Sequence, residues 1–280
     1  HVSIGQEAVA AGMCSAMQPQ DYLTSTHRGH GHFIARGGGL GRMMAELFGK
    51  ETGYCKGRGG SMHITDISIG HLGANGIVGG HLGIAAGAAL WSQLSNNNAV
   101  TVCFFGEGAT NEGIIHESLN MAALWKLPVV FVVENNHYAM SLAWERSTAQ
   151  LSFSEKASAY GIPGVDVDGQ DALAVHEVAT DAIARARRGE GPTLIGAHTY
   201  RFLGHSRADP SKYRSSEEEE RERARDPLTI MLTKAGSDVI TDSDLEAYEA
   251  EVKQMLDDAV KFAEDSPLAQ PSTVFEDIYA

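Results

Sequence analysis

The most informative pattern in the chain is a pair of short apolar runs separated by a helix-length segment. The first run, 100–105, ends in Gly106-Glu107-Gly108, and the second, 128–133, leads to Asn135-Asn136. Such a pattern predicts two parallel strands joined by a crossover helix over 111–125. The apolar residues of this helix are numerous, and we expect it to be deeply buried. Both strands then end at one edge of the sheet, which is where open α/β sheets bind ligands.

Similar patterns predict further elements on both sides of this unit. An apolar period near 3.6 residues predicts helices at 40–48, 81–94, 154–160, 172–188 and 242–265, and short apolar runs predict strands at 22–25, 164–167 and 192–199. Asp171 is a suitable N-cap for the helix that follows it. We therefore expect an α/β fold with a mostly parallel sheet and helices on both faces. We interpret residues 1–280 as a single domain in which 215–280 is a helical C-terminal extension.

Three segments near the C-terminus lead to more specific predictions. The helix at 242–265 has apolar residues suited to docking along one face, and the tail 267–280 is apolar enough to rest on a partner chain. The segment 215–225 is dense in charge and predicts a solvated helix start. The chain begins without an initiator methionine, and we expect a further segment to precede His1.

Glycine-rich segments at 49–64 and 70–80 predict long loops. Neither ends in the GK[ST] signature of a phosphate-binding P-loop, which argues against a nucleoside triphosphatase. Glycine is costly in conformational entropy, and long irregular segments inside compact domains more often serve a function.

Composition narrows the class of protein. The 280 residues carry a formal net charge of −14, which argues against nucleic-acid binding because phosphate backbones require a basic face. No apolar run approaches the roughly 18 residues of a bilayer span, and no signal-peptide pattern opens the chain, so we expect no membrane association and a cytoplasmic location. Cys14, Cys55 and Cys103 form no CxxC pair, and Cys103 lies in an apolar strand as a small core residue would.

Several polar groups are candidates for chemistry at the predicted sheet edge. The Glu107 carboxylate and the amides after the second strand are hard oxygen ligands, suited to Mg²⁺ held together with phosphates. In 27–32, HRGHGH, three readings stay open: a metal site, although zinc ligands are usually spaced differently, an anion site around Arg28, or a solvated polar loop. The loop 200–214 is polar and cationic, and it belongs to the same crevice on topological grounds.

The segment GEG also resembles the start of a dinucleotide fingerprint. Asn111 stands where the third glycine of that fingerprint is required, which disfavours a nicotinamide-binding Rossmann site. An NAD-dependent oxidoreductase remains the alternative from another enzyme class.

Taken together, the motifs resemble one family. GEG followed by Asn135-Asn136 resembles the thiamine-diphosphate motif, and the whole chain is similar to the alpha subunit of the E1 component of 2-oxo acid and acetoin dehydrogenase complexes. The segments that carry this resemblance, in family order, are SIGQEA (3–8), HRGHG (27–31), KGRGGSMH (56–63), GANGIVG (73–79), NMAALWKLP (120–128) and TYRFLGHSRADP (199–210).

The resemblance implies a set of site residues. Mg²⁺ would be bound by Glu107, the Asn136 side chain and the Tyr138 carbonyl. The diphosphate would contact Gly108, Ala109, His27, Arg28 and His205, and the aminopyrimidine ring would contact the backbone of Gly76 and Val78. The implied catalytic histidines are His1, His30 and His205. Two positions depart from the family pattern: Glu107 replaces the usual aspartate, and His27 replaces a common tyrosine.

The resemblance also implies partners and a reaction. An E1 beta subunit would complete an α₂β₂ heterotetramer and supply the glutamate that activates the cofactor, and a lipoyl-bearing E2 transacylase would accept the acyl group. The substrate would be pyruvate, another small 2-oxo acid, or acetoin. A non-catalytic assembly subunit is a further alternative, for which the change at Glu107 is the main argument.

Overall fold

The fold is built on a six-stranded parallel sheet. The computed structural model describes residues 1–276. The strands lie in the order β2-β1-β3-β4-β8-β7, and each neighbouring pair is parallel. Their bounds are β1 Tyr22–Thr26, β2 His71–Asn75, β3 Thr101–Gly106, β4 Val129–Asn135, β7 Gly164–Asp168 and β8 Thr193–His198, and a separate ribbon pairs β5 Tyr138–Ala139 with β6 Leu142–Ala143. The predicted parallel α/β sheet is confirmed.

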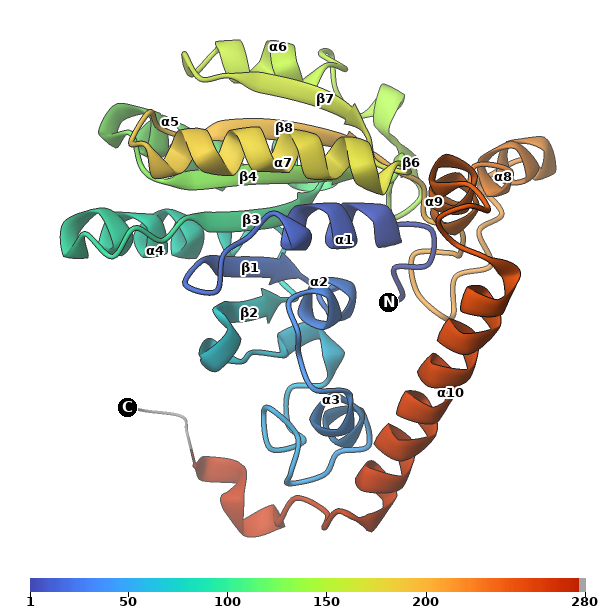
Figure 1. The fold of residues 1–280 in the computed structure, drawn as a ribbon. Helices are drawn as coiled ribbons and strands as arrows, with labels where there is room; N and C mark the ends of the chain where they lie inside the picture. The colour runs from blue at the N-terminus through green and yellow to red at the C-terminus, as the bar shows by residue number, and fades with distance from the viewer. Residues whose placement is uncertain (277–280) are drawn as a thin grey trace.

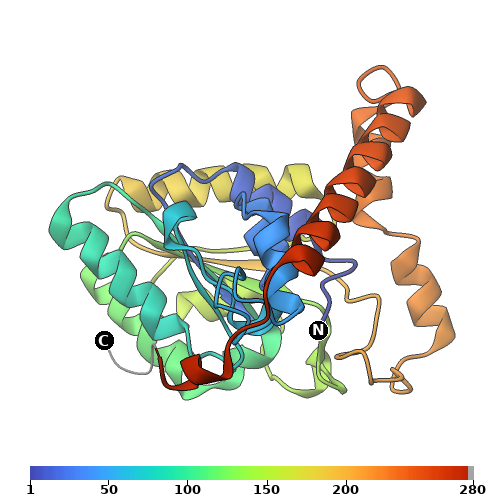
Figure 2. The ribbon, with the colours of Figure 1, turned by 90° about the horizontal axis from the view of Figure 1, so that it is seen from below.

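Helices cover both faces of this sheet, as Figures 1 and 2 show. Helices α1 and α7 pack on one face, and α4, α5 and α6 pack on the other. The bounds are α1 Glu7–Ser15, α2 His30–Ala35, α3 Leu40–Leu47, α4 Leu82–Ser95, α5 Gly113–Trp125, α6 Phe153–Ser158, α7 Ala172–Arg187, α8 Ser216–Arg223, α9 Pro227–Ala235 and α10 Asp242–Asp265. Short 3₁₀ turns are η1 Ser61–His63, η2 Ile67–Ile69, η3 Glu107–Asn111, η4 Trp144–Arg146 and η5 Pro271–Phe275.

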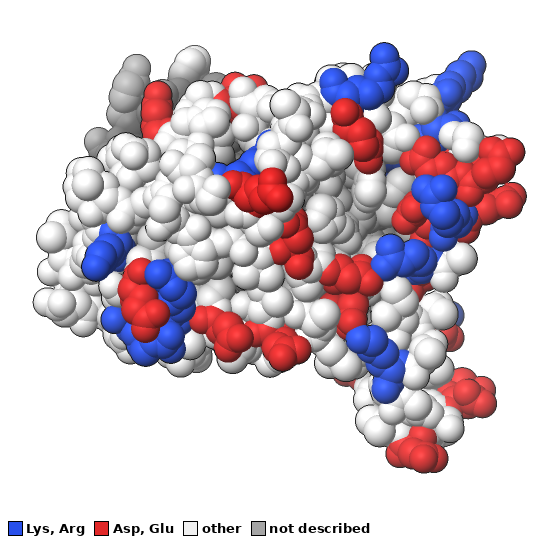
Figure 3. Space-filling model, turned by 90° about the horizontal axis from the view of Figure 1, so that it is seen from above, with Lys and Arg blue, Asp and Glu red and all other residues white. Residues whose placement is uncertain are grey.

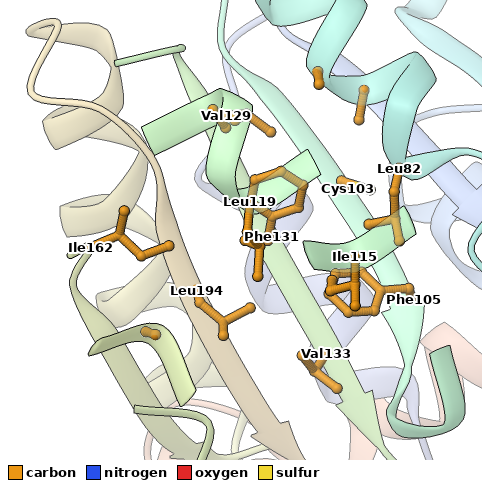
Figure 4. Packing of buried hydrophobic residues seen from close by; sticks show 14 of the residues in the cluster. Leu82, Cys103, Phe105, Ile115, Leu119, Val129, Phe131, Val133, Ile162 and Leu194 are labelled. Carbon is orange, nitrogen blue, oxygen red and sulfur yellow. The ribbon is translucent and has the colours of Figure 1, made fainter. Parts of the chain in front are cut away.

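The core is divided between the two faces by the alternation of side chains along the central strands. In β4, Val130 and Val132 face α1 and α7, whereas Phe131 and Val133 face α4 and α5. Figure 4 shows the second of these clusters, in which Cys103 is a fully buried core residue as predicted. A sheet buried on both faces requires apolar residues on both, which explains why its central strands are continuous apolar runs.

The strand order creates the crevice. From β1 the chain moves outward to β2, and it then crosses back to form β3 on the other side of β1. The carboxyl ends of β1 and β3 therefore lie side by side at a point where the chain reverses its direction of progress. Such a switch point is the usual ligand position in open α/β sheets.

Two predicted loops contain regular structure. The segment 70–80, predicted as a loop, begins with the edge strand β2, which pairs with β1 although His71-Leu72-Gly73 carries little apolar signal. The polar-loop reading of 27–32 is likewise wrong in part, because α2 begins at His30 and buries Phe33. In both places tertiary contacts with β1 and its neighbours outweigh local composition.

Helix α5 is not deeply buried as predicted. It begins at Gly113, after the turn η3, and its buried residues form one stripe: Ile115, Ser118, Leu119 and Ala122. Leu124 is 72% exposed, and Trp125 and Met121 are also exposed. The sequence therefore has an apolar surface here that residues 1–276 do not cover.

The docking predicted for α10 is also wrong for most of its length. Only Ala259 and Ala263 are buried, where the helix packs against α3, and Tyr248, Val252 and Met255 are exposed. Figure 2 shows the first turns of α10 standing out from the body of the molecule. In the tail, Phe275 is 83% exposed, and 277–280, which the tail prediction included, lie outside the described residues.

The first glycine-rich segment wraps around one buried carboxylate. Glu46, in α3, accepts hydrogen bonds from the backbone N–H groups of Cys55, Gly57, Gly59 and Gly60 at 2.8–3.0 Å. Gly57 adopts a positive φ of 75°, and a Cβ there would lie 2.5 Å from the backbone of the preceding turn. The glycines thus let the chain close around the carboxylate.

Charge is concentrated at one end of the molecule. Figure 3 shows acidic and basic side chains crowded where α8 lies, whose sequence is SEEEERER and which buries none of its residues. The predicted solvated helix start is confirmed there. Across residues 1–276, no helix combines the length and the apolar character needed to traverse a bilayer.

Candidate functional site

A cavity of about 290 Å³ lies at the carboxyl edge of the sheet. It collects residues that directly follow four strands: His27 and Arg28 after β1, Glu107 after β3, Asn136 after β4, and Arg201 shortly after β8. The predicted site residues that line it are His27, Arg28, Val78, Glu107, Gly108, Ala109, Asn136, Tyr138 and His205.

Three predicted residues do not line this cavity. Gly76 stands between Asn75 and Ile77, which do line it. His1 lies against the rings of two lining histidines, as described below. His30 is directed elsewhere: its Nε2 is 3.1 Å from the Ser3 hydroxyl.

Glu107 and Asn136 form a buried pair in the cavity wall. Glu107 is only 2% exposed, and its Oε2 accepts a hydrogen bond of 3.2 Å from the backbone N–H of Asn136. Burial raises the pKa of the Glu107 carboxyl, and backbone N–H groups and the charges of Arg201 and Arg28 oppose that rise. A desolvated carboxylate of this kind is stabilised when a cation binds beside it.

Arg201 is a site residue that sequence reasoning missed. Its guanidinium donates to Asn136 Oδ1 at 3.4 Å, to the Tyr138 carbonyl at 3.1 Å and to the Met140 carbonyl at 3.0 Å. The residue is 1% exposed although it is charged. The oxygens of Asn136 and Tyr138 thus already converge on a positive charge. The cationic composition of 200–214 indicated the loop but not which of its residues reaches the cavity.

Gln6 is a second missed residue, and it orients Asn136. The Asn136 side-chain amide donates to Gln6 Oε1 at 2.9 Å, and Gln6 is 2% exposed. With its NH₂ group engaged in this way, Asn136 turns its oxygen toward Arg201 and the cavity. The segment SIGQEA marked this position in the sequence, but only the tertiary contact across 130 residues shows its purpose.

Arg28 supplies a buried positive charge to the cavity. Its Nη1 donates to the Val2 carbonyl at 2.6 Å, and its Nη2 donates to the His205 carbonyl at 2.8 Å. Burial and the charge of Arg201 lower its pKa to about 10, so the guanidinium stays protonated at neutral pH. Two carbonyl bonds hold the group in place without neutralising it, which suits an anionic ligand.

Three histidine rings gather beside Arg28. The ring centroids of His1 and His27 are 4.8 Å apart, those of His1 and His205 are 4.9 Å apart, and those of His27 and His205 are 5.6 Å apart. Burial, together with the charge of Arg28, lowers the pKa of His27 to about 3 and that of His205 to about 4. Both imidazoles are therefore neutral at pH 7.

The cavity fits a diphosphate held with a metal ion, on two observations. The buried Nε2 of His27 has no hydrogen-bond partner within the described chain, so a donor or acceptor position is left for a ligand. At Gly108 a Cβ would lie 2.9 Å from the Cβ of Ala139, so the position requires glycine. Because glycine has no side chain, its backbone beside Glu107 is open to a ligand. Oxygen donors from Glu107, Asn136 and Tyr138 are the type that Mg²⁺ prefers.

Comparisons with known proteins agree on one family. The family model described as "Dehydrogenase E1 component" matches residues 1–272. The alpha subunit of acetoin:2,6-dichlorophenolindophenol oxidoreductase from Bacillus subtilis (strain 168) is 47% identical over 284 residues, covering 100% of this chain and 84% of that protein. The pyruvate dehydrogenase E1 component subunit alpha of Porphyra purpurea is 46% identical, covering 95% of this chain and 80% of that protein. Its counterpart from Rhizobium meliloti (strain 1021) is 41% identical, covering 99% and 80% respectively.

Proposed function

This chain belongs to the dehydrogenase E1 component family, and we propose on that premise that it is the alpha chain of an enzyme that oxidatively cleaves or decarboxylates a small carbonyl substrate. Membership implies the use of thiamine diphosphate. The substrate is pyruvate, a similar small 2-oxo acid, or acetoin, and a lipoyl carrier receives the acyl group. The NAD-dependent alternative has no support among these relatives.

The observation that carries this proposal is that one cavity is lined both by oxygen ligands and by cationic and imidazole groups. The oxygens of Glu107, Asn136 and Tyr138 are assigned to Mg²⁺. Arg28 and the neutral imidazoles are assigned to the diphosphate oxygens together with Gly108 and Ala109. The backbone of Gly76 and Val78 is assigned to the aminopyrimidine ring.

Arg201 supports the metal assignment by what it already binds. A guanidinium and Mg²⁺ both require oxygen acceptors, and Arg201 holds the Asn136 and Tyr138 oxygens in a convergent arrangement. We propose that Arg201 keeps these oxygens in position before the metal arrives and retains its bond to Met140 afterwards. Gln6 performs the same positioning role on the other atom of the Asn136 amide.

The chemistry at the carbonyl is divided between cofactor and protein. Thiamine diphosphate, when bound, supplies the electron sink that allows a bond next to a carbonyl carbon to break. His1 is proposed to hold or transfer a proton at Nε2, because its Nδ1 lies 2.9 Å from the His205 carbonyl and is engaged there. His205 is neutral at pH 7, so it is proposed to donate a hydrogen bond to developing charge. His30 is kept as a proposed neighbour of this group.

An apolar surface beside the cavity supports the assignment of a partner chain. Ile77, Val78 and Met140 are exposed and also line the cavity. Further large apolar residues are exposed on α4 and α5: Ile84, Trp91, Leu94, Met121, Leu124 and Trp125. Groups of exposed apolar residues often mark a protein interface. We propose that an E1 beta chain covers this surface in an α₂β₂ heterotetramer and contributes the glutamate that activates the cofactor.

The decisive experiment measures Mg²⁺-dependent binding of thiamine diphosphate to the protein co-purified with its beta chain. Glu107→Asp should retain binding, whereas Glu107→Ala should weaken it by at least about tenfold, since even outer partners of metal sites act on that scale. Glu177→Ala, an exposed carboxylate of α7 on the other face of the sheet, is the matched control and should bind like the wild type. Unchanged Mg²⁺-dependent affinity in Glu107→Ala would overturn the metal assignment.

The same preparation distinguishes the remaining alternatives. Dye reduction compared among pyruvate, acetoin and branched 2-oxo acids identifies the substrate. Failure to bind thiamine diphosphate even with the beta chain present would favour a non-catalytic assembly subunit. Full-rate turnover by the alpha chain alone would contradict a site shared between two chains.

A further inference from the structure

The cluster of His1, His27 and His205 has a property that cofactor binding does not require. The ligand nitrogens of the three rings all lie within 4.8 Å of one another. Among residues 1–276, this is the group of His, Cys, Asp or Glu side chains whose ligand atoms converge closely enough to hold a metal ion. We propose that these three imidazoles form a second metal site, one for a borderline divalent transition ion such as Zn²⁺.

The geometry is close to what such an ion needs. Zinc binds imidazole nitrogen at about 2.0–2.1 Å, and three tetrahedral ligands then stand about 3.4 Å apart. The rings come from three separate segments, the N-terminus, the turn after β1 and the loop after β8, so each can adjust by a small side-chain rotation. Three protein ligands leave a fourth position for water, the arrangement of an open rather than a structural zinc site.

The hydrogen bonds leave lone pairs available. His1 engages the His205 carbonyl through Nδ1 at 2.9 Å, which places its proton there and leaves Nε2 as an acceptor. A backbone carbonyl on the second ring nitrogen is the usual orienting contact of a metal-binding histidine. The Nε2 of His27 is buried and has no hydrogen-bond partner in the described chain.

The positive charge of Arg28 and its contact with His205 oppose the binding of a metal ion at this site. Arg28 Nη2 lies 3.3 Å from His205 Nδ1, a long contact that a metal bound through this nitrogen would break. Arg28 keeps its shorter bonds to the carbonyls of His205 and Val2. Its positive charge weakens the binding of any cation, so a strongly imidazole-binding ion is needed. Mg²⁺ prefers oxygen ligands and does not meet that condition.

The consequence for function rests on the proposed cofactor placement. His27 and His205 both line the cavity. An ion held by them occupies the position assigned to the diphosphate contacts, so the transition metal and thiamine diphosphate exclude each other. The structure thus assigns this chain a metal site whose occupation would inhibit cofactor binding.

The test is a titration of the protein co-purified with its beta chain, without a histidine tag, with Co²⁺ as a spectroscopic probe and Zn²⁺ as its competitor. One Co²⁺ should bind with the absorption of a four-coordinate ion. His27→Tyr, which removes one ligand and keeps an aromatic ring, and His205→Asn should each weaken binding at least about tenfold. His176→Asn, at an exposed histidine of α7, is the control and should leave the affinity unchanged. Thermal unfolding of each variant verifies that it is folded.

The outcomes separate this proposal from the proposed function. Affinity for Co²⁺ that is unaffected by both His27→Tyr and His205→Asn would overturn the three-histidine site. Displacement of Co²⁺ by thiamine diphosphate with Mg²⁺ supports both the site and the cofactor placement. Co²⁺ that is lost in the variants but persists beside bound thiamine diphosphate supports the metal site and contradicts the assignment of these histidines to the diphosphate.

Discussion

Replacing Glu46 should release the glycine-rich loop that follows α3. The Glu46 carboxylate accepts four backbone hydrogen bonds: Oε2 from Cys55 and Gly57, and Oε1 from Gly59 and Gly60, at 2.8–3.0 Å. Its side chain is buried, with the residue 2% exposed. Hydrogen bonds to a charged group contribute about 1.5–3 kcal/mol each, and removing the acceptor leaves buried donors unsatisfied.

Glu46→Ala should lower the free energy of unfolding more than Glu46→Gln. In Glu46→Ala all four N–H groups lose their acceptor, and partial hydration of the loop recovers part of the loss, so we expect the free energy of unfolding to fall by about 3–5 kcal/mol. In Glu46→Gln one oxygen still accepts two bonds, but the amide NH₂ faces two N–H donors. The expected loss is about 2–3 kcal/mol.

Chemical denaturation measures both values, and amide hydrogen exchange locates the effect. The amides of Gly57 and Gly59 should exchange faster in both variants than in the wild type. Glu51→Ala, an exposed carboxylate in the same loop, is the matched control and should change stability by less than about 0.5 kcal/mol. A Glu46→Ala protein that keeps wild-type stability and protected loop amides would refute the reasoning.

Two further predictions concern the cavity and its histidines. Gly108→Ala places a Cβ 2.9 Å from the Cβ of Ala139 and should weaken thiamine diphosphate binding, which calorimetry measures. Gly106→Ala is the control, because its Cβ meets nothing within 4 Å, and it should bind like the wild type. Equal affinities in the two variants would contradict the close packing at Gly108. Burial lowers the pKa of His27 and His71 to about 3 and that of His30 and His205 to about 4. These imidazoles stay neutral in the folded state, whereas in the unfolded chain they take up protons near pH 6.5. The free energy of unfolding should therefore reach its full value above about pH 6.5 and fall as the pH drops toward 4. Denaturant midpoints measured between pH 7.5 and 4.5 test this, and a flat profile would show that these histidines are not buried as neutral groups.

Much of the site could be predicted because its polar residues directly follow apolar runs in the sequence. Strands β3 and β4 are buried on both faces, so their composition marks them, and the residues that follow them are placed by the end of the strand. Glu107 and Asn136 could therefore be assigned to one crevice before any contact was known. The cap at Asp171 was found for a similar local reason, since its side chain accepts from the backbone of the residues two and three positions later.

The features that were missed depend on contacts between distant segments. Strand β2 has a weak local pattern and exists because it pairs with β1. Arg201 and Gln6 are ordinary polar residues in the sequence, and their role follows from reaching Asn136 across 65 and 130 positions. An apolar helix face also does not reveal what covers it, and in α10 most of the apolar side chains are exposed.

The sequence by itself determined the alternation of strands and helices, the carboxyl edge that bears Gly106-Glu107-Gly108, and the polar groups available there. These follow from local periodicity and from the geometry of a parallel strand, which does not depend on strand order. Only the tertiary structure decided that β1 lies beside β3, which brings His27 and Arg28 into one cavity with Glu107. Strand order is set by the packing of both faces together, and no single segment of the chain contains that information.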